Sequence, residues 1–245
     1  MNNLTKFPVE DSTVSMWVFK GQRSRAFSVP LSDKLMEEFK RIKITCLAGV
    51  ANYVAYDSGA AVDKDTAMII DGDIDQWSKL LVLLTAPVED RHVRSISGLQ
   101  NNLAYVVVFS NNGKKLYAVK KVSSSLGSKK SSNAFDALFS GKKLDVAENL
   151  VFSISKTFDF FYAEEAFYIL NRTNFESVLG YKEHYKKNFT DLIADQVFQS
   201  KVGNLEVLAN YVGENAIQLG RMSAIKEKKK FADPSAWAAR FGKKF

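Results

Sequence analysis

The chain has 245 residues, 46% of them hydrophobic and 25% charged, which is the composition of an ordinary globular protein with one large or two small domains. Its single cysteine, Cys46, excludes an internal disulfide, and the apolar residues around it predict a buried structural thiol in a reducing compartment. No signal peptide is recognisable, and the longest apolar run near the middle, Leu103 to Phe109, is too short to cross a bilayer as a helix.

The first hundred residues carry nearly balanced charge and predict a separate α/β unit. Strands are expected at residues 14–19, 26–29 and 67–70. Helices are expected at residues 32–43 and 77–84, the first with Ser32 as its N-cap. The stretch from 91 to 98 is the best candidate for a domain boundary, so an N-terminal α/β domain is predicted at residues 1–98.

The net charge of the chain is +7, and the excess of Lys and Arg over Asp and Glu is concentrated in two segments. Residues 101–150 hold eight Lys and Arg against three Asp and Glu, and residues 201–245 hold nine against four. In the first segment, the strand run from Leu103 is followed by the turn signal Asn111-Asn112-Gly113, which predicts a hairpin. A Ser-rich loop at 123–132 and a short helix-like stretch at 133–139 come next.

The lysines of the first segment are candidates for contact with DNA. They are Lys114, Lys115, Lys120, Lys121, Lys129, Lys130, Lys142 and Lys143. Lysine clusters attract phosphate backbones because binding releases condensed counterions. No arginine accompanies them, and arginine is the usual reader of guanine edges, so binding without sequence specificity is favoured. The structural alternative is that these lysines maintain solubility or protect an edge strand.

The second basic segment predicts a helix from Gly213 to Lys230. Four lysines gather at its end, where they complement the helix dipole and form a second candidate for DNA contact. They are Lys226, Lys228, Lys229 and Lys230. Asp233-Pro234 predicts the start of a further helix, whose Trp237 and Phe241 share one face.

Residues 152–185 form an aromatic block that predicts a packed hairpin with a helix laid on it. Alternation from Phe152 indicates a half-buried strand, and the polar turn Ala163-Glu164-Glu165 separates it from a run at 167–170 that is typical of a strand buried on both faces. Thr173 and Glu176 have the spacing of a capping box at the start of the helix. The whole block is interpreted as structural.

The order of residues in this block, F-D-F-F followed by F-Y-I-L-N-R-T-N-F-E-S-V-L-G-Y, resembles the KwaB-like family, the soluble component of the bacterial Kiwa anti-phage system. The resemblance is clearest from Phe158 to Tyr185 and extends from about Leu103 to Phe245. It implies a KwaB-like α+β domain at residues 99–245. It also implies a further strand and helix beyond the last residues, so either a C-terminal tail is missing or the fold closes differently.

The expected fold class is therefore α+β, with an N-terminal α/β unit, a central mainly antiparallel sheet with hairpins, and C-terminal helices. The resemblance implies an anti-phage defence effector that binds DNA and acts with a membrane-embedded Kiwa partner protein. A cytoplasmic protein that this partner recruits to the inner membrane is expected, as is a homo-oligomer, with a dimer favoured.

The sequence offers little support for catalysis, and no cofactor, metal ligand or catalytic residue is assigned. His92 and His184 are far apart and neither lies in a metal-ligand pattern, and phosphate-binding and nucleophile motifs are absent. Two alternatives to the DNA-binding effector stay open. One is an interaction module whose basic surface docks on an acidic protein, and the other is a metal-dependent nuclease with scattered carboxylates.

Overall fold

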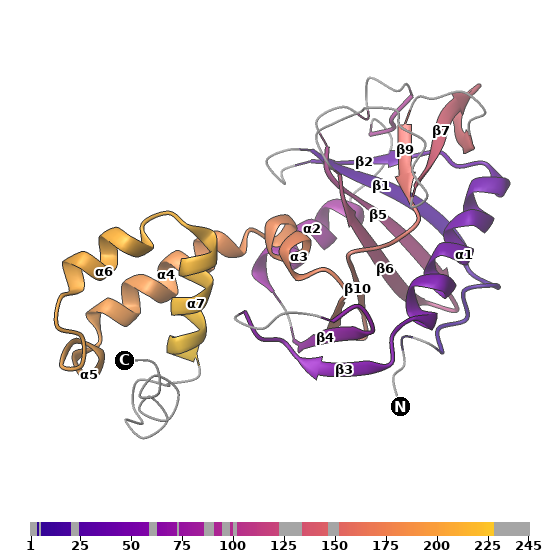
Figure 1. Cartoon of the computed structure of the whole chain (residues 1–245). Helices are drawn as coiled ribbons and strands as arrows, with labels where there is room; N and C mark the ends of the chain where they lie inside the picture. Colours follow the sequence, from indigo (N-terminus) through magenta and orange to yellow (C-terminus); the bar gives the residue numbers. More distant parts are fainter. Residues whose placement is uncertain are drawn as a thin grey trace. The chain divides into compact units, whose positions relative to one another are not determined.

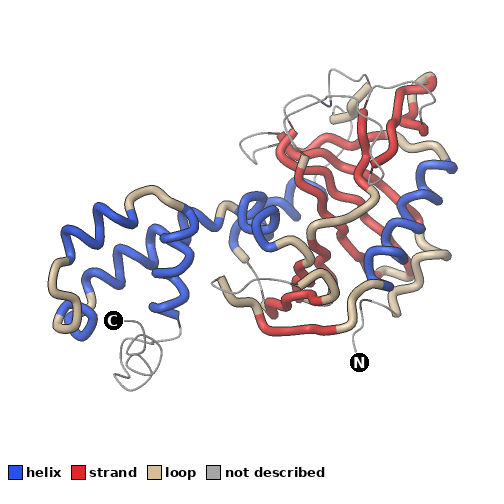
Figure 2. Tube along the Cα trace, in the orientation of Figure 1, coloured by secondary structure: helices blue, strands red, loops and turns tan. Residues whose placement is uncertain are grey.

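The computed structural model describes residues 4, 6–20, 25–58, 63–72, 74–85, 91–94, 99, 102–122, 134–146 and 152–227. The chain divides into two compact units. Residues 1–55 and 62–178 form the first, called here the sheet unit, and residues 56–61 and 179–245 form the second, called the helical unit. Strands occupy the first unit, and the described part of the second contains only helices and loops (Figures 1 and 2).

An eight-stranded sheet forms the centre of the sheet unit, in the order β2-β1-β5-β6-β10-β11-β4-β3. Its strands are β1 (Thr13–Lys20), β2 (Ala26–Val29), β3 (Asn52–Ala55), β4 (Thr66–Asp71), β5 (Asn102–Asn111), β6 (Lys114–Lys121), β10 (Phe160–Ala163) and β11 (Ala166–Ile169). All neighbours are antiparallel except β3 and β4, which are parallel. With helices α1 (Asp33–Ala48), α2 (Asp75–Thr85) and α3 (Arg172–Leu179), the fold is α+β, as predicted.

The compact units do not coincide with the predicted boundary near residue 98. β1 pairs along its length with β5, from Thr13 opposite Ser110 to Phe19 opposite Ala104. β4 pairs with β11. Strands from both sides of the expected boundary thus share one sheet, because the hydrophobic faces of the early strands are buried against partners that come later in the chain.

A second, three-stranded sheet has the order β8-β7-β9, with β7 at Ala134–Ser140, β8 at Lys143–Val146 and β9 at Phe152–Ser155. The helix-like stretch predicted at 133–139 is therefore wrong. That segment is a strand because β8 and β9 satisfy its backbone on both sides. Ala137, Leu144 and Ile154 are buried in the main core, which anchors this sheet to the rest of the unit.

Each face of the large sheet has its own core. On one face, Phe39 of α1 lies 6.4 Å from the ring of Tyr105 and 6.5 Å from that of Phe158. On the other face, the buried Trp77 of α2 meets aromatic rings from β6, β10 and β11 at centroid distances of 5.2–6.0 Å. Phe175 of α3 adds a T-shaped contact with Phe160 at 5.0 Å. A hairpin with a helix packed on it is present as predicted, but it is formed by β10 and β11, whereas the alternating segment from Phe152 is β9 and belongs to the three-stranded sheet. Burying so many aromatic rings supplies much of the unit's stability.

Asp159 is the buried polar centre of this arrangement, with 1% of its surface exposed. Its carboxylate accepts hydrogen bonds from the Lys120 ammonium at 2.9 Å, the Lys121 backbone N–H at 2.8 Å and the Asn174 side-chain amide at 3.0 Å. One side chain thereby connects β6 to α3. A buried carboxylate is tolerated when its oxygens are paired and hydrogen-bonded in this way.

The backbone of Asp159 extends the same network. Its N–H donates to the Val119 carbonyl at 2.8 Å, and its carbonyl accepts from the N–H groups of Leu170 and Asn171 at 2.9 and 2.8 Å. The residue therefore fixes the segment before β10 against both β6 and the end of β11. The Phe-Asp pair of the aromatic block therefore has a structural role, since it holds neighbouring strands together.

Asn171, and not Thr173, caps α3. The helix begins at Arg172, and the Asn171 side-chain oxygen accepts from the Asn174 N–H at 3.0 Å. The predicted capping box is wrong because Asn171 is held in place by Asp159, two residues before the expected cap. Glu176 instead lies 3.3 Å from the Arg172 guanidinium across one helical turn.

The helical unit contains α4 (Tyr181–Ala194), α5 (Gln196–Gln199), α6 (Leu205–Val212) and α7 (Ala216–Glu227). The predicted helix at 213–230 is found from Ala216, since Gly213, with φ 44°, ends α6. The segment after β3 belongs to this unit: the Tyr56 and Tyr185 hydroxyls lie 2.6 Å apart, and Ser58 donates to the Gly220 carbonyl.

Replacing Asp159 by Ala should lower the free energy of unfolding by about 3–5 kcal/mol, because three partly buried donors lose their acceptor at once. Urea unfolding followed by circular dichroism measures this loss. Asp63→Ala is the matched control, since Asp63 is an exposed carboxylate of the same unit, and it should change stability by less than about 0.5 kcal/mol. Equal effects of the two substitutions would contradict the structural role of Asp159.

Candidate nucleic-acid interface

The β5–β6 hairpin presents the first pair of candidate lysines. Its turn has φ 47° at Asn112 and φ 80° at Gly113, which confirms the turn predicted from the sequence. Lys114 and Lys115 follow at once, and both are exposed, with 72% of the Lys114 side chain accessible. A tight turn therefore places two cations at the end of a rigid hairpin.

The β7–β8 hairpin presents the second pair. Lys143 pairs with Ser140 across the turn, and Gly141 adopts φ 64° between the strands. Lys142 and Lys143 are both exposed. The same device, a tight turn with two lysines directly after its glycine, thus occurs twice in the sheet unit.

The remaining lysines of β6 lie at the other end of that strand. Lys121 lies six positions after Lys115, which corresponds to about 20 Å along a strand. Lys121 is half-buried, and Lys120 forms the ion pair with Asp159 with only 18% of its side chain accessible. The ion pair explains Lys120 without any contact to DNA, so the four lysines of β6 do not make one continuous patch.

Of the four candidate lysines at the end of the second basic segment, Lys226 lies among the described residues. Lys226 forms an ion pair with Asp191 of α4 and lies 3.4 Å from the Asn188 side-chain oxygen. It joins α7 to α4 within the unit. Five further candidates lie outside the described residues: Lys129, Lys130, Lys228, Lys229 and Lys230.

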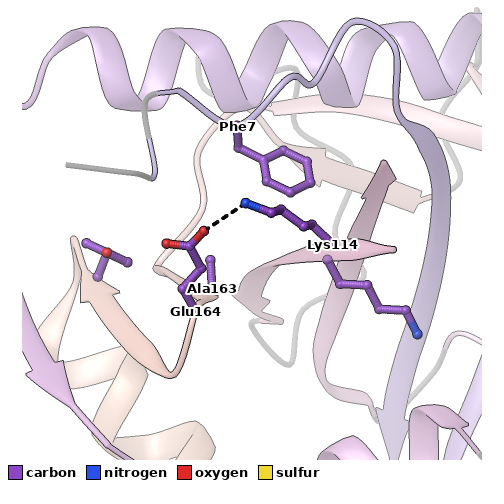
Figure 3. Close-up of a pocket in the computed structure, with 6 residues that line it drawn as sticks. Phe7, Lys114, Ala163 and Glu164 are labelled. Atoms are coloured by element: carbon purple, nitrogen blue, oxygen red, sulfur yellow. Dashed lines mark ion pairs between the residues drawn. The ribbon is translucent and has the colours of Figure 1, made fainter. Parts of the chain in front are cut away.

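A small pocket of about 240 Å³ adjoins the β5–β6 hairpin tip. It is lined by Phe7, Lys114, Lys115, Ala163, Glu164 and Tyr168. Figure 3 shows the Lys114 and Glu164 side chains pointing toward one another below the Phe7 ring, and their charged atoms are 3.5 Å apart. Burial raises the pKa of Tyr168, and the negative charge of Glu164 raises it further.

Phe7 reaches this pocket from the N-terminal segment, which two lysines of α1 hold. The Lys40 ammonium donates to the Glu10 carbonyl at 2.8 Å, and the Lys43 ammonium lies 3.5 Å from the Phe7 carbonyl. Lys43 is buried, and desolvation lowers its pKa to about 8. Sequence reasoning missed this contribution because it assigned the first hundred residues to another domain.

The turn between β10 and β11 is acidic and has an unusual backbone. Glu164 and Glu165 have φ 49° and 60°, values that L-residues other than Asn and Asp rarely adopt and that cost roughly 1–2 kcal/mol each. The sequence predicted a polar turn here but not this conformation. The signal that could have found it is the two-residue length of the turn, because a two-residue hairpin turn with a matching twist requires positive φ at both positions.

A polar network joins α4 and α7 in the helical unit. The buried Ser223 hydroxyl donates to the Glu227 carboxylate at 2.9 Å, and the Asn188 amide lies 2.9 Å from the same oxygen. His184 is 3.3 Å from it, and this contact is the main cause of a pKa of Glu227 below its usual value. The network connects two helices through groups that can titrate.

The described part of the chain holds no group of three His, Cys, Asp or Glu side chains placed to bind a metal ion. Cys46 is half-buried; its thiol accepts from the Phe158 N–H at 3.4 Å and donates to the Lys156 carbonyl at 3.8 Å. Burial raises its pKa, which lowers the fraction of reactive thiolate. The thiol thus connects α1 to the segment before Asp159, in line with the structural role expected from the sequence.

Comparison with known proteins places most of the later part of the chain in a family. A model of the KwaB family, described as Kiwa protein KwaB-like, matches residues 99–236. No curated protein and no solved structure matches the chain. Among the described residues, no helix is both long and apolar enough to span a membrane.

The match covers more than half of the chain, so the protein belongs to the KwaB-like family. This confirms the resemblance seen in the aromatic block. Membership implies a component of the Kiwa anti-phage defence system. The matched region contains the β5–β6 and β7–β8 hairpins and most of the helical unit, whereas β1 to β4 lie before it.

The low pKa of Glu227 leads to a pH-dependent stability. Its ionised form stabilises the folded state fully above the unfolded pKa, near 4.5, and this contribution is lost as the pH falls through the lower folded pKa. The stability difference between the wild type and Glu227→Gln should therefore shrink as the pH falls below about 4.5. Thermal unfolding from pH 7 to pH 3 measures it.

His184→Asn tests the cause of this effect, since it removes the contact that contributes most to the lowered pKa of Glu227. In the His184→Asn background, the difference in stability between the protein with Glu227 and the protein with Gln at this position should vary less with pH. A difference that stays constant from pH 7 to pH 3 in the wild-type background would contradict the lowered pKa.

Proposed function

We propose that this KwaB-like protein is a DNA-binding effector of anti-phage defence that binds the phosphate backbone largely without sequence specificity. Contact would be made by the lysines of the two hairpin tips, Lys114 and Lys115 on one and Lys142 and Lys143 on the other. The protein would act by binding and not by catalysis. A cytoplasmic location, recruitment to the inner membrane through a membrane-embedded partner and a homodimeric assembly complete the proposal.

The observation that carries the proposal is the state of Lys115, Lys142 and Lys143. All three are exposed, and none forms an ion pair with a described residue. Family membership supplies the context of anti-phage defence. Exposed lysines at the ends of rigid hairpins can approach a phosphate backbone without reordering the fold, and each contact releases condensed counterions from DNA.

The use of lysine in place of arginine supports binding without sequence specificity. A lysine ammonium is a compact point charge, whereas base readout usually employs the planar fork of arginine. The lysines are also divided between two hairpins, which suits contact with several phosphates and not with one base step. Lys120, Lys121 and Lys226 are left outside the proposed surface because each is paired or partly buried.

Replacing Lys114, Lys115, Lys142 and Lys143 by Gln should weaken binding to duplex DNA and flatten its salt dependence by about one unit of slope per lost phosphate contact. Fluorescence anisotropy with a labelled duplex, measured at several salt concentrations, reports both quantities. Two unrelated duplex sequences should bind with similar affinity, because the contacts are to the backbone.

The matched control removes four exposed lysines from elsewhere, namely Lys64, Lys79, Lys187 and Lys201. It has the same net charge as the test variant and should retain most of the affinity. Equal losses in the two variants would show a general charge effect and reject the assigned surface. Incubation with Mg²⁺ in the same assay should leave the duplex intact, and cleavage would favour the nuclease alternative.

One observation favours a protein-contact function for the helical unit. Val207 and Tyr211 lie one turn apart on α6, and Ile217 lies at the start of α7; all three are well exposed. Gln218 donates to the Tyr211 hydroxyl at 3.1 Å, which connects the two helices at this point. An exposed apolar patch of this kind is typical of an interaction site, and we assign it to the membrane-embedded partner.

Replacing Val207 and Ile217 by Ser should reduce co-purification with the membrane-embedded Kiwa partner in detergent and leave DNA affinity unchanged. The control substitutes two exposed valines of the sheet unit, Val54→Ser and Val82→Ser. Undiminished recovery of the partner with the first variant would reject this patch. Sedimentation of the protein alone tests the proposed dimer.

A further inference from the structure

The acidic turn between β10 and β11 lies beside the lysines of the β5–β6 hairpin. β10 pairs directly with β6, and Tyr162 lies opposite Tyr117 in the sheet. Continuing three residues along β6 and two along β10 leads from this pair to Lys114 and Glu164. Figure 3 shows these two side chains facing one another, and their charged atoms are 3.5 Å apart.

Both partners of this ion pair are accessible to an outside ligand. The Lys114 side chain is 72% exposed and the Glu164 side chain 46%. Exposed pairs of this kind are weak, because water and salt screen them. When a phosphate approaches the hairpin tip, the charge of Lys114 is already partly neutralised by Glu164. Because this ion pair is weak, the phosphate can displace the carboxylate.

The backbone holds the carboxylate in this place despite an unfavourable conformation. Glu164 and Glu165 both have positive φ, whereas the β5–β6 turn uses Asn112 and Gly113, which tolerate such values. The Glu165 carbonyl also accepts the Gly72 N–H at 2.8 Å, so β4 fixes the turn from its other side. Asn and Gly would form this turn with less strain, and strain that persists at a charged position points to a role for the charge.

A second observation shows that negative charge is concentrated at this end of the sheet. After burial, the causes that raise the pKa of Tyr168 are the charge of Glu164 and then that of Asp71. Asp71 lies opposite Ala166 at the start of β11. Glu164 is thus the carboxylate next to the lysine tip, and Asp71 adds negative charge farther along the same sheet, on β4, two strands beyond β10.

We propose that Glu164 is an internal competitor for DNA phosphate at Lys114. The inference rests on the proposed function and adds a regulatory residue to its surface. The carboxylate occupies the ammonium in the free protein, and a phosphate has to displace it. Isolated phosphates and small anions then gain little at this tip, whereas a DNA duplex that is already held by other lysines can open the pair.

Glu164→Gln should tighten binding to duplex DNA by about 2- to 5-fold at low salt, because it removes the competing charge while keeping the size of the side chain. Glu165→Gln is the matched control. It lies in the same turn, has the same positive φ and changes the net charge equally. An equal gain in both variants would show a general charge effect and reject the specific competition, as would no gain with Glu164→Gln.

A double-mutant cycle gives the decisive measurement. Lys114→Gln should weaken DNA binding only slightly in the wild type and more strongly when Glu164 is already Gln, because the lysine is then free to contact phosphate. Identical losses in the two backgrounds would overturn the inference. Thermal unfolding of every variant shows whether the fold is retained.

The outcome also separates the inference from the proposed function. If the four-lysine variant loses DNA binding and Glu164→Gln leaves DNA affinity unchanged, the competition by Glu164 is rejected and the proposed DNA-binding surface is retained. Failure of the wild-type protein to bind DNA at any salt concentration would reject both. Replacing Glu164-Glu165 by Asn-Gly separates charge from strain, since it should raise both the melting temperature and DNA affinity, whereas Glu164→Gln should raise affinity alone.

Discussion

The sheet unit depends on one buried carboxylate. Asp159 accepts hydrogen bonds from the side chain of Lys120, the backbone of Lys121 and the amide of Asn174, and its own carbonyl holds the end of β11. β6, the β10–β11 hairpin and α3 meet at this residue. Without it, β6, which carries Lys114 and Lys115, would lose its polar connection to the β10–β11 hairpin and to α3. The Phe-Asp motif of the aromatic block thus stabilises the fold and is not itself part of the proposed DNA-binding surface.

The lysines of β6 differ in the acidic residues that they contact. Within β6, Lys120 neutralises Asp159, Lys114 meets Glu164, and Lys115 is exposed without an ion pair to any described residue. Three lysines within seven residues therefore have three different electrostatic surroundings. The count of positive charges along a sequence indicates that a basic segment exists, but the acidic partners that arrive from other strands decide which charges a ligand can meet.

Local signals explain what could be predicted from the sequence. β2 occupies the expected residues, the turn at Asn112-Gly113 forms as expected, and Ser32 caps α1 through a hydrogen bond from the Leu35 N–H. The failures have other causes. The strand at 134–140 forms because β8 and β9 pair with it, and the cap of α3 moves to Asn171 because Asp159 holds that backbone. β9 and Asp159 are each distant in sequence from the segment that they hold. The acidic turn adopts positive φ because two residues have to connect two paired strands, and Glu is not a residue type that indicates this conformation.

The short excursion of residues 56–61 into the helical unit has a practical meaning for dissecting the protein. Tyr56 and Ser58 are bonded to Tyr185 and Gly220, although the chain returns to the sheet at β4 immediately afterwards. A fragment that begins near residue 98 would lack four strands of the large sheet and also these contacts of the helices. The region that carries the family resemblance is therefore not a separable module, and truncation at its border would remove structural support from both units.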